Sequence, residues 1–366
     1  MLSLIPLSAA AFSAAAAYLL GKYRKQRGCH VPGIFLYLMF VLPFAAGGFH
    51  TYVSAVTVVC LVIHLVMTAG KQGYLRITLN VNSVAVLLVV LGYCIPPLWA
   101  ADKGMAVFGI ARYLPMLLYV LALMQLTPEQ KREGLALIPL SGAAMTALSC
   151  LMLLFPGADA CLTVNGRLAG FLQYPNTYAA FLLAGLILQY SGNDRRKSDI
   201  LVDAMLILGV ILSGSKTGFV LLVVTAVGIA ILYRKIKPVL TLAGFILCGL
   251  VLALMISKLD ILRHVNRFAD IRLSSHSFLV RLLYFKDVLP MILKNPVGCG
   301  YLGYRALQGT FQTGKYYVTY IHNGFLQLLF EIGWVPALTM AAALLRGMCS
   351  QKTAPGYRLL LFVTLA

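Results

Sequence analysis

Long apolar runs recur from one end of the chain to the other, and they constrain its fold more than any other feature. A helix needs about 17–25 mostly apolar residues to cross about 30 Å of hydrocarbon. Hydrophobic residues make up 60% of the chain and charged residues 11%, whereas soluble domains carry about 25% charged residues. We predict membrane segments near residues 4–20, 33–49, 52–69, 83–100, 105–126, 135–155, 174–191, 199–213, 217–233, 238–256 and 323–345. The sequence predicts an all-α polytopic transmembrane bundle of about 11–12 helices, and residues 1–366 form a single integral membrane domain.

The formal net charge of +19 has two interpretations. A basic chain binds polyanions such as nucleic acid, or it carries the Lys and Arg excess that marks cytoplasmic loops. With the N-terminus outside, the cytoplasmic links hold 17 of the 30 basic residues. The short outer links hold only Lys103, Arg112, Arg167 and Lys216. This distribution predicts a multi-pass protein of the cytoplasmic (inner) membrane, surrounded by membrane lipids, with no nucleic acid partner.

The remaining nine basic residues fall in one long link, residues 257–321, on the predicted outer side. A loop of that length usually has a function or structure of its own. Residues 278–294 within it have the pattern of an amphipathic helix that lies at the membrane interface. We therefore expect a large extracytoplasmic loop whose partner is an external anion.

Two short motifs imitate cofactor signatures without their context. Gly298, Gly300 and Gly303 spell GxGxxG, but the dinucleotide fingerprint requires a preceding strand and an acid about 20 residues later. The SGSKTG stretch at 213–218 breaks the GK[ST] spacing of a P-loop. We predict a glycine-rich turn at 298–303, no cofactor, and no metal site, since no metal-ligand spacing occurs.

Two polar clusters lie at predicted external ends of helices. The first is GRLAGFLQYPNTY at 166–178, where Arg167 precedes a segment and Pro175-Asn176 marks the turn into it. The second is SGSKTG, a hairpin so tight that Lys216 lies at the outer rim of the membrane. Taken alone, an external Arg contacts lipid headgroups or water, and a Lys at the rim reaches the interface with its long side chain.

A third cluster, HNGFLQLLFEIGW at 322–334, opens the last complete segment. Asn323, Gln327 and Glu331 are spaced to share one face of a helix. A polar stripe that enters the bilayer favours a functional site, and the structural alternative is hydrogen bonding between helices. His322 has a side chain whose usual pKa of about 6.5 suits proton transfer near neutrality.

The ordered set RLAGFLQYPN, SGSKTG, RLLYFKDVLPMILKNPVGCGYLGY and HNGFLQLLFEIG, over roughly residues 160–335, resembles the O-antigen ligase and O-antigen polymerase (Wzy-like) family. The resemblance implies an inverting, metal-independent glycosyltransferase of the membrane-embedded C type. Such an enzyme takes a glycan from undecaprenyl diphosphate and transfers it to a hydroxyl of a glycan or lipid acceptor outside the cytoplasm. Its product would be a surface polysaccharide, such as O-antigen, capsule or a teichuronic-type polymer.

The resemblance also implies roles for individual residues. The family's first external Arg corresponds to Arg167, its second basic position to Lys216, and its His before Asn to His322, with Arg281 matching the Arg of the loop helix. Lys216 departs from the family, where Arg is common, and a Lys cannot form the two-pronged bond of a guanidinium. In this hypothesis Arg167, Lys216 and Arg281 stabilise the diphosphate, and His322 orients the acceptor hydroxyl or takes its proton. The other substrate-binding candidates are Asn176, Asn323 and Gln327.

Several alternatives stay open. A polymerase and a ligase differ mainly in the acceptor, and we favour polymerisation because nothing in the sequence indicates an outer membrane. A transporter or flippase for an anionic lipid-linked substrate predicts inverted repeats and charges near the bilayer midplane, and we find no repeat. A relative of the shape-and-division peptidoglycan polymerases would use an external-loop aspartate, for which Asp260, Asp270 and Asp287 are the candidates.

Overall fold

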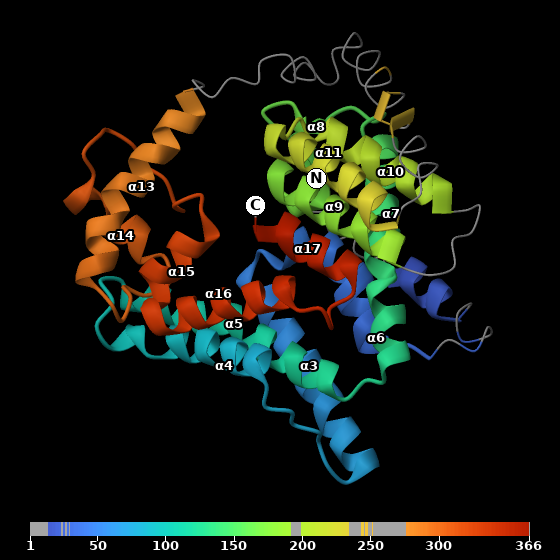
Figure 1. The fold of residues 1–366 in the computed structure, drawn as a ribbon, viewed down its shortest axis with the longest axis horizontal. Helices are drawn as coiled ribbons and strands as arrows, with labels where there is room; N and C mark the ends of the chain where they lie inside the picture. Colours follow the sequence, from blue (N-terminus) through green and yellow to red (C-terminus); the bar gives the residue numbers. More distant parts are fainter. Residues whose placement is uncertain are drawn as a thin grey trace. The chain divides into compact units, whose positions relative to one another are not determined.

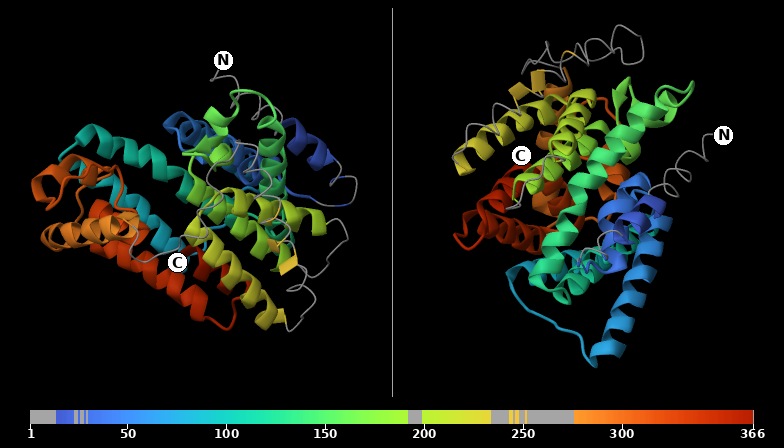
Figure 2. Two further views of the ribbon diagram at one scale, coloured as in Figure 1. Left: turned by 90° about the horizontal axis from the view of Figure 1, so that it is seen from above. Right: turned by 90° about the vertical axis from the view of Figure 1, so that its right-hand side faces the viewer.

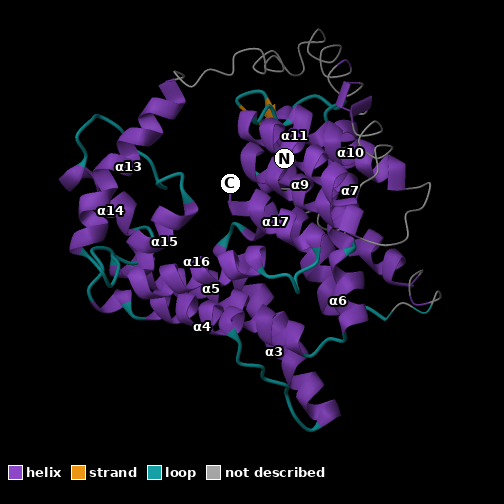
Figure 3. Ribbon diagram, in the orientation of Figure 1, coloured by secondary structure: helices purple, strands orange, loops and turns teal. Residues whose placement is uncertain are grey.

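The computed structural model describes residues 14–22, 25, 28, 30–191, 199–233, 243–244, 246–247, 251 and 276–365. Nearly all regular structure in these ranges is helical, and the strands are limited to one two-stranded hairpin (Figure 3). The predicted all-α polytopic class is therefore confirmed. Most of the predicted segments 4–20 and 238–256, and loop residues 257–275, lie outside the described residues.

Within the described ranges, four helical stretches are long and apolar enough to cross a membrane, as judged by length and composition. They are Thr51–Gln72, Val81–Leu98, Lys103–Met124 and Pro128–Met152. Each overlaps a predicted segment, so this part of the chain forms a multi-pass membrane protein.

The chain divides into two compact units, which we describe separately. Unit 1 comprises Met1–Phe49, Thr127–Ile271 and Met348–Ala366, and unit 2 comprises His50–Leu126 and Arg272–Gly347. Each unit is thus assembled from segments that lie far apart in the sequence.

Unit 1 is built mainly from apolar helices. Its elements are α2 (Gly33–Leu36), η1 (Tyr37–Val41), η2 (Leu42–Phe44), η3 (Ala46–Gly48), α6 (Pro128–Leu135), α7 (Leu137–Met152), α8 (Asp159–Leu162), β1 (Thr163–Val164), β2 (Arg167–Leu168), η5 (Gly170–Leu172), α9 (Pro175–Ser191), α10 (Asp199–Leu212), α11 (Lys216–Tyr233) and α17 (Pro355–Leu365). The single helix predicted at 33–49 is wrong beyond Leu36. There the chain passes from an α-turn into a π-helix and two 3₁₀ turns, because Pro43 lacks an amide donor and Gly47 adopts a positive φ of 60°.

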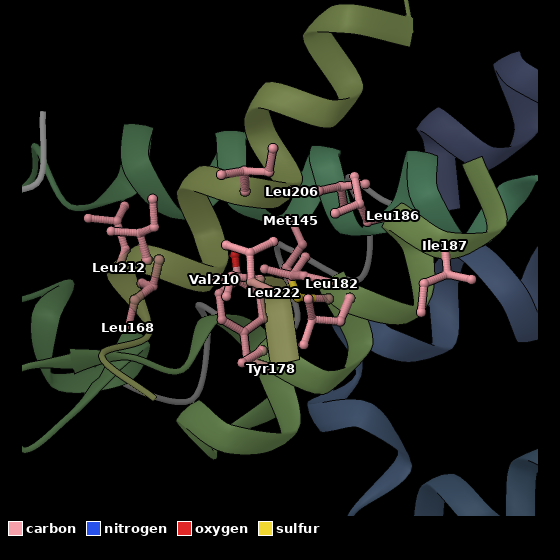
Figure 4. Packing of buried hydrophobic residues seen from close by; sticks show 14 of the residues in the cluster. Met145, Leu168, Tyr178, Leu182, Leu186, Ile187, Leu206, Val210, Leu212 and Leu222 are labelled. Carbon is pink, nitrogen blue, oxygen red and sulfur yellow. The ribbon is translucent and has the colours of Figure 1, made fainter. Parts of the chain in front are cut away.

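The core of unit 1 lies where α7, α9 and α10 meet (Figures 1 and 4). Tyr178 and Leu182 of α9 are fully buried there, and the Tyr178 hydroxyl lies 2.6 Å from Thr146 Oγ1 of α7. Gly209 of α10 permits this contact, since a Cβ there would meet Leu182, Thr146 and Tyr178. Small residues at such points let membrane helices approach closely, and α9 becomes a rigid base for the residues at its N-terminus.

Unit 2 combines α3 (Thr51–Gln72), α4 (Val81–Cys94), η4 (Pro96–Leu98) and α5 (Lys103–Met124) with α13 (His276–Lys294), α14 (Gly303–Phe311), α15 (Gly324–Ile332) and α16 (Trp334–Cys349). Figure 2 shows the long helix α3 and the extended link that follows it. Arg76 in this link exchanges two backbone hydrogen bonds with the Gln125 side chain at the end of α5, both of 2.9 Å. The end of α3 and the end of α5 therefore lie together. The assignment of Arg112 to a short outer link is wrong, because Arg112 lies within α5.

The segment predicted as one helix at 323–345 is two helices, α15 and α16, separated by Gly333. Gly333 has φ 81° and ψ −176°, and a Cβ there would collide with the carbonyl oxygen of Pro296. The predicted glycine-rich turn packs against this break. The amides of Cys299 and Gly300 donate to the carbonyl oxygens of Phe330 and Glu331, which end α15. The turn thus satisfies carbonyl groups that a helix end leaves without partners.

Candidate functional site

Arg167 is presented by a two-residue β-hairpin. Val164 pairs with Arg167 across it, and the turn residues Asn165 and Gly166 have φ of 52° and 70°. Positive φ at both turn positions is the type I′ geometry that an Asn-Gly pair favours. The sequence analysis did not predict this hairpin, although the Asn-Gly dipeptide was a signal that could have revealed it.

The Arg167 side chain reaches the turn between α10 and α11. Its Nε donates to the Ser213 carbonyl at 2.9 Å, and its Nη2 donates to Asn176 Oδ1 at 2.7 Å. Asn176 lies in the first turn of α9. The structure therefore joins two sequence clusters that are separated along the chain: the 166–178 stretch, which supplies Arg167 of the hairpin and the start of α9, and the SGSKTG turn. We call Arg167, Asn176 and residues 213–216 the arginine site.

The SGSKTG turn is tight, as predicted, and its two serines are buried. Ser213 and Ser215 are no more than 2% exposed, and Gly214 has a φ of 56°. The Ser215 hydroxyl accepts the Gly218 amide at 3.0 Å, which is the bond of an N-terminal helix cap. Lys216 is the first residue of α11 and is half-buried. Its ammonium group thus adds to the positive end of a helix dipole.

His322 lies in unit 2, beside the helix α13. Its imidazole stacks on the ring of Tyr284, with centroids 6.1 Å apart and planes 27° from parallel. Its φ is 62°, a region that non-glycine residues seldom adopt. Partial withdrawal from solvent, and then the positive charge of Arg281, lower the pKa of His322 below its usual value. The imidazole is therefore neutral at neutral pH and able to accept a proton. We call Arg281, Tyr284 and His322 the histidine site.

Asp287 fixes the segment that leads to His322. Its buried carboxylate accepts hydrogen bonds from the Thr313 amide, the Thr313 hydroxyl and the Tyr316 hydroxyl, at 2.7–2.9 Å. Burial by itself raises the pKa of Asp287, but these bonds, together with Lys286, lower it on balance. The carboxylate is ionised and bonded within the loop, which weighs against its use as the catalytic aspartate of the peptidoglycan-polymerase alternative. Asp260 and Asp270 lie outside the described residues.

The predicted polar stripe is engaged inside the protein. Asn323 is the N-cap of α15, and its Oδ1 accepts the Leu326 amide. The Gln327 amide accepts the Ile321 N–H and donates to Glu331, while the buried Glu331 also accepts from Tyr93 of α4. The hydrogen bonding between helices that was the structural alternative is thus present at Glu331.

Among the described residues, no three His, Cys, Asp or Glu side chains come together as metal ligands. The predicted site residues form two groups, one in each unit. Arg167, Asn176 and Lys216 belong to unit 1, and Arg281, His322, Asn323 and Gln327 belong to unit 2. The sequence analysis missed Tyr284 and Tyr93. Their positions in the apolar pattern are those of ordinary aromatic residues in a core, so the pattern gave no signal of a role in the site.

The family comparison gives a match over part of the chain. The family model described as O-Antigen ligase matches residues 201–341. The match supports an O-antigen ligase or polymerase-like family. The matched stretch contains Lys216 and all four site residues of unit 2, whereas Arg167 and Asn176 precede it. Comparisons with curated proteins and with solved structures gave no match.

The matched family supports glycosyl transfer of the ligase or polymerase type in surface polysaccharide biosynthesis. The same family implies lipid-linked glycan substrates and a membrane environment.

Proposed function

We propose that this chain transfers a glycan from undecaprenyl diphosphate to an acceptor hydroxyl on the outer face of the cytoplasmic membrane. Residues 160–335 form the catalytic region within a single membrane domain, and residues 257–321 form its extracytoplasmic loop. One observation carries the proposal: the Arg167 guanidinium is bonded to the very turn that places Lys216 at the N-terminus of α11. Such a convergence of positive charge and a helix N-terminus favours the binding of a diphosphate.

In the proposed reaction, the acceptor oxygen attacks the anomeric carbon of the donor as the bond from that carbon to the phosphate oxygen breaks. The acceptor proton passes to His322, whose neutral imidazole acts as general base. Undecaprenyl diphosphate leaves with the bonding electrons, and Arg167, Lys216 and Arg281 stabilise the negative charge that develops on it. Attack from the face opposite the leaving group inverts the anomeric configuration, and no metal takes part.

The decisive experiment incubates the purified full chain with undecaprenyl-diphosphate-linked oligosaccharide, with and without candidate acceptors. A ladder of longer lipid-linked glycans is the expected result, because we favour polymerisation. A single shifted acceptor identifies a ligase instead. Movement of unmodified lipid between leaflets, without any transfer, contradicts the proposal and favours the flippase alternative.

The charge of Lys216 is expected to matter more than its shape. Lys216→Arg retains a cation at the start of α11, so transfer should stay within about tenfold of the wild type. Lys216→Ala removes the cation and should lower kcat by about 10²-fold, the typical effect of losing one transition-state donor. Steady-state rates of glycan transfer measure both effects. Equal losses in the two variants would contradict a purely electrostatic role.

The positive charge of Arg281 helps to keep His322 neutral. A general base works above its pKa, so activity falls as the pH drops through that value. Arg281→Gln removes a positive charge that lowers the pKa of His322, so that pKa should rise. The acid limb of the profile of kcat against pH, where kcat falls as the base is protonated, should therefore move to higher pH. Lys294→Gln, which changes an exposed cation at the far end of α13, is the matched control and should leave the limb in place.

A further inference from the structure

The buried acid Glu331 lies near the end of α15. It is the acceptor in each of its described hydrogen bonds. Glu331 is 1% exposed. Its Oε1 accepts the Leu302 amide at 2.9 Å and the Gln327 Nε2 at 2.7 Å. Its Oε2 accepts the Tyr93 hydroxyl at 2.7 Å. An ionised carboxylate only accepts hydrogen bonds, so it matches three donors that converge from α4, the glycine-rich turn and α15.

Glu331 in turn determines which way the Gln327 amide points. Because the Nε2 of Gln327 faces a carboxylate oxygen, its Oε1 faces the opposite way and accepts the Ile321 N–H at 2.9 Å. The reversed amide would set its NH₂ group against the Ile321 N–H and its oxygen against the carboxylate. Only one orientation of Gln327 therefore satisfies both neighbours.

Ile321 immediately precedes His322 and is fully buried. His322 itself has a φ of 62°, and such backbone persists only where its surroundings hold it. The bond from Gln327 fixes the backbone on one side of His322, and the stack on Tyr284 fixes its ring on the other. The tertiary contacts thus hold His322 in a conformation that the chain by itself disfavours.

We propose that Glu331 and Gln327 are positioning residues that set the direction of the His322 imidazole for proton transfer. They act through Ile321 and do not touch the substrate, which gives Gln327 a different role from the substrate contact expected from its sequence. This inference rests on the proposed function of His322 as the acceptor-side base.

Substitution of Gln327 by Glu gives a specific pH signature. The new carboxylate still accepts the Ile321 N–H, but its other oxygen meets Glu331, and two carboxylates remain in contact only when they share a proton. That proton leaves as the pH rises, and repulsion then separates the two side chains. The transfer rate of Gln327→Glu, divided by that of the wild type, should therefore fall from about pH 6 to about pH 9, the range of buried carboxyl groups. Tyr93, Tyr113, Tyr301 and Arg112 are the titratable and charged groups that act on Glu331.

Substitutions of Glu331 separate hydrogen bonding from charge. In Glu331→Gln, one oxygen still accepts from Leu302 and Gln327, and the Tyr93 hydroxyl turns to accept from the new NH₂ group. This variant should keep transfer within about tenfold of the wild type, because it loses a charge-assisted bond and not the network. Glu331→Leu leaves the Gln327 amide without its acceptor and should lower kcat by about 10²-fold, the effect of a misplaced catalytic group. The acceptor KM should change little.

Amide hydrogen exchange in the full chain provides a readout that does not depend on activity. Exchange of the peptide around Ile321 should rise in Glu331→Leu, and in Gln327→Glu at high pH, while helix α3 remains protected. Thr339→Ala removes one hydrogen bond of α16 and is the matched control, with exchange and transfer like the wild type.

The proposal would be overturned if hydrogen exchange at Ile321 were unchanged in Glu331→Leu. It would also be overturned if exchange in that variant were faster while its rate of glycan transfer stayed at the wild-type value. If a His322 variant kept wild-type transfer, the proposed function of His322 would fail instead. Exchange at Ile321 would then still report whether the network holds that backbone.

Discussion

Replacing His322 by Asn is expected to lower glycan transfer by about 10²–10⁴-fold, the usual contribution of a general base. Asn is the appropriate substitution because His322 has a φ of 62°, and Asn tolerates this left-handed region better than Ala does. The variant should therefore fold and insert like the wild type while lacking a group that accepts a proton near neutral pH. The measurement is kcat for transfer from the undecaprenyl-diphosphate donor.

His30→Asn is the control for this substitution. His30 is exposed, and its described hydrogen bond uses the backbone carbonyl, which the change retains. It should transfer glycan at the wild-type rate. If His322→Asn also did so, His322 would not be the base, and the proton acceptor would have to be sought elsewhere in the chain.

Replacing Arg167 by Ala is expected to lower kcat by about 10²–10³-fold. The change removes a guanidinium that donates to Ser213 in the α10–α11 turn and to Asn176 at the start of α9, and removal of one preorganised electrostatic donor typically has this effect. Arg167→Lys should recover only part of the loss, because an ammonium group cannot bond to Ser213 and Asn176 in the same forked geometry. Rates with the lipid-linked donor test both variants.

Two controls separate a loss of charge from a loss of structure. Arg132→Ala removes an exposed cation from α6 and should leave transfer unchanged. Asn176→Asp places a carboxylate within hydrogen-bonding distance of the guanidinium, where it competes with a phosphate, whereas Asn176→Ala only removes one bond. Asn176→Asp should therefore be the more damaging of the two. The opposite order would mean that Asn176 contacts the substrate directly and does not serve to orient Arg167.

The sequence predicted most segments because apolar length and charge distribution are local properties. It failed where a tertiary contact changes the backbone. Residues 33–49 read as one apolar helix, but Pro43 and Gly47 break it. Residues 323–345 read as another, but it breaks at Gly333, where the Trp334 amide donates to the carbonyl oxygen of Pro296 in a distant turn.

The candidate site shows the same division. Arg167, Lys216 and His322 could be selected from the sequence because the ordered motifs that contain them resemble those of the O-antigen ligase and polymerase family. The partners of those residues could not be selected. Asn176 was expected to hold substrate and bonds to Arg167. Tyr93, more than two hundred residues from Glu331 in sequence, completes the buried network beside His322.

The sequence by itself determined the membrane class, the distribution of charge along the chain and the order of the motifs, because each depends on residues that are neighbours in the chain. Only the tertiary structure decided what each polar side chain bonds to. Ser213, the partner of Arg167, and Tyr93, the partner of Glu331, come from elements distant in sequence, and a buried donor or acceptor must be satisfied by whichever element packs against it.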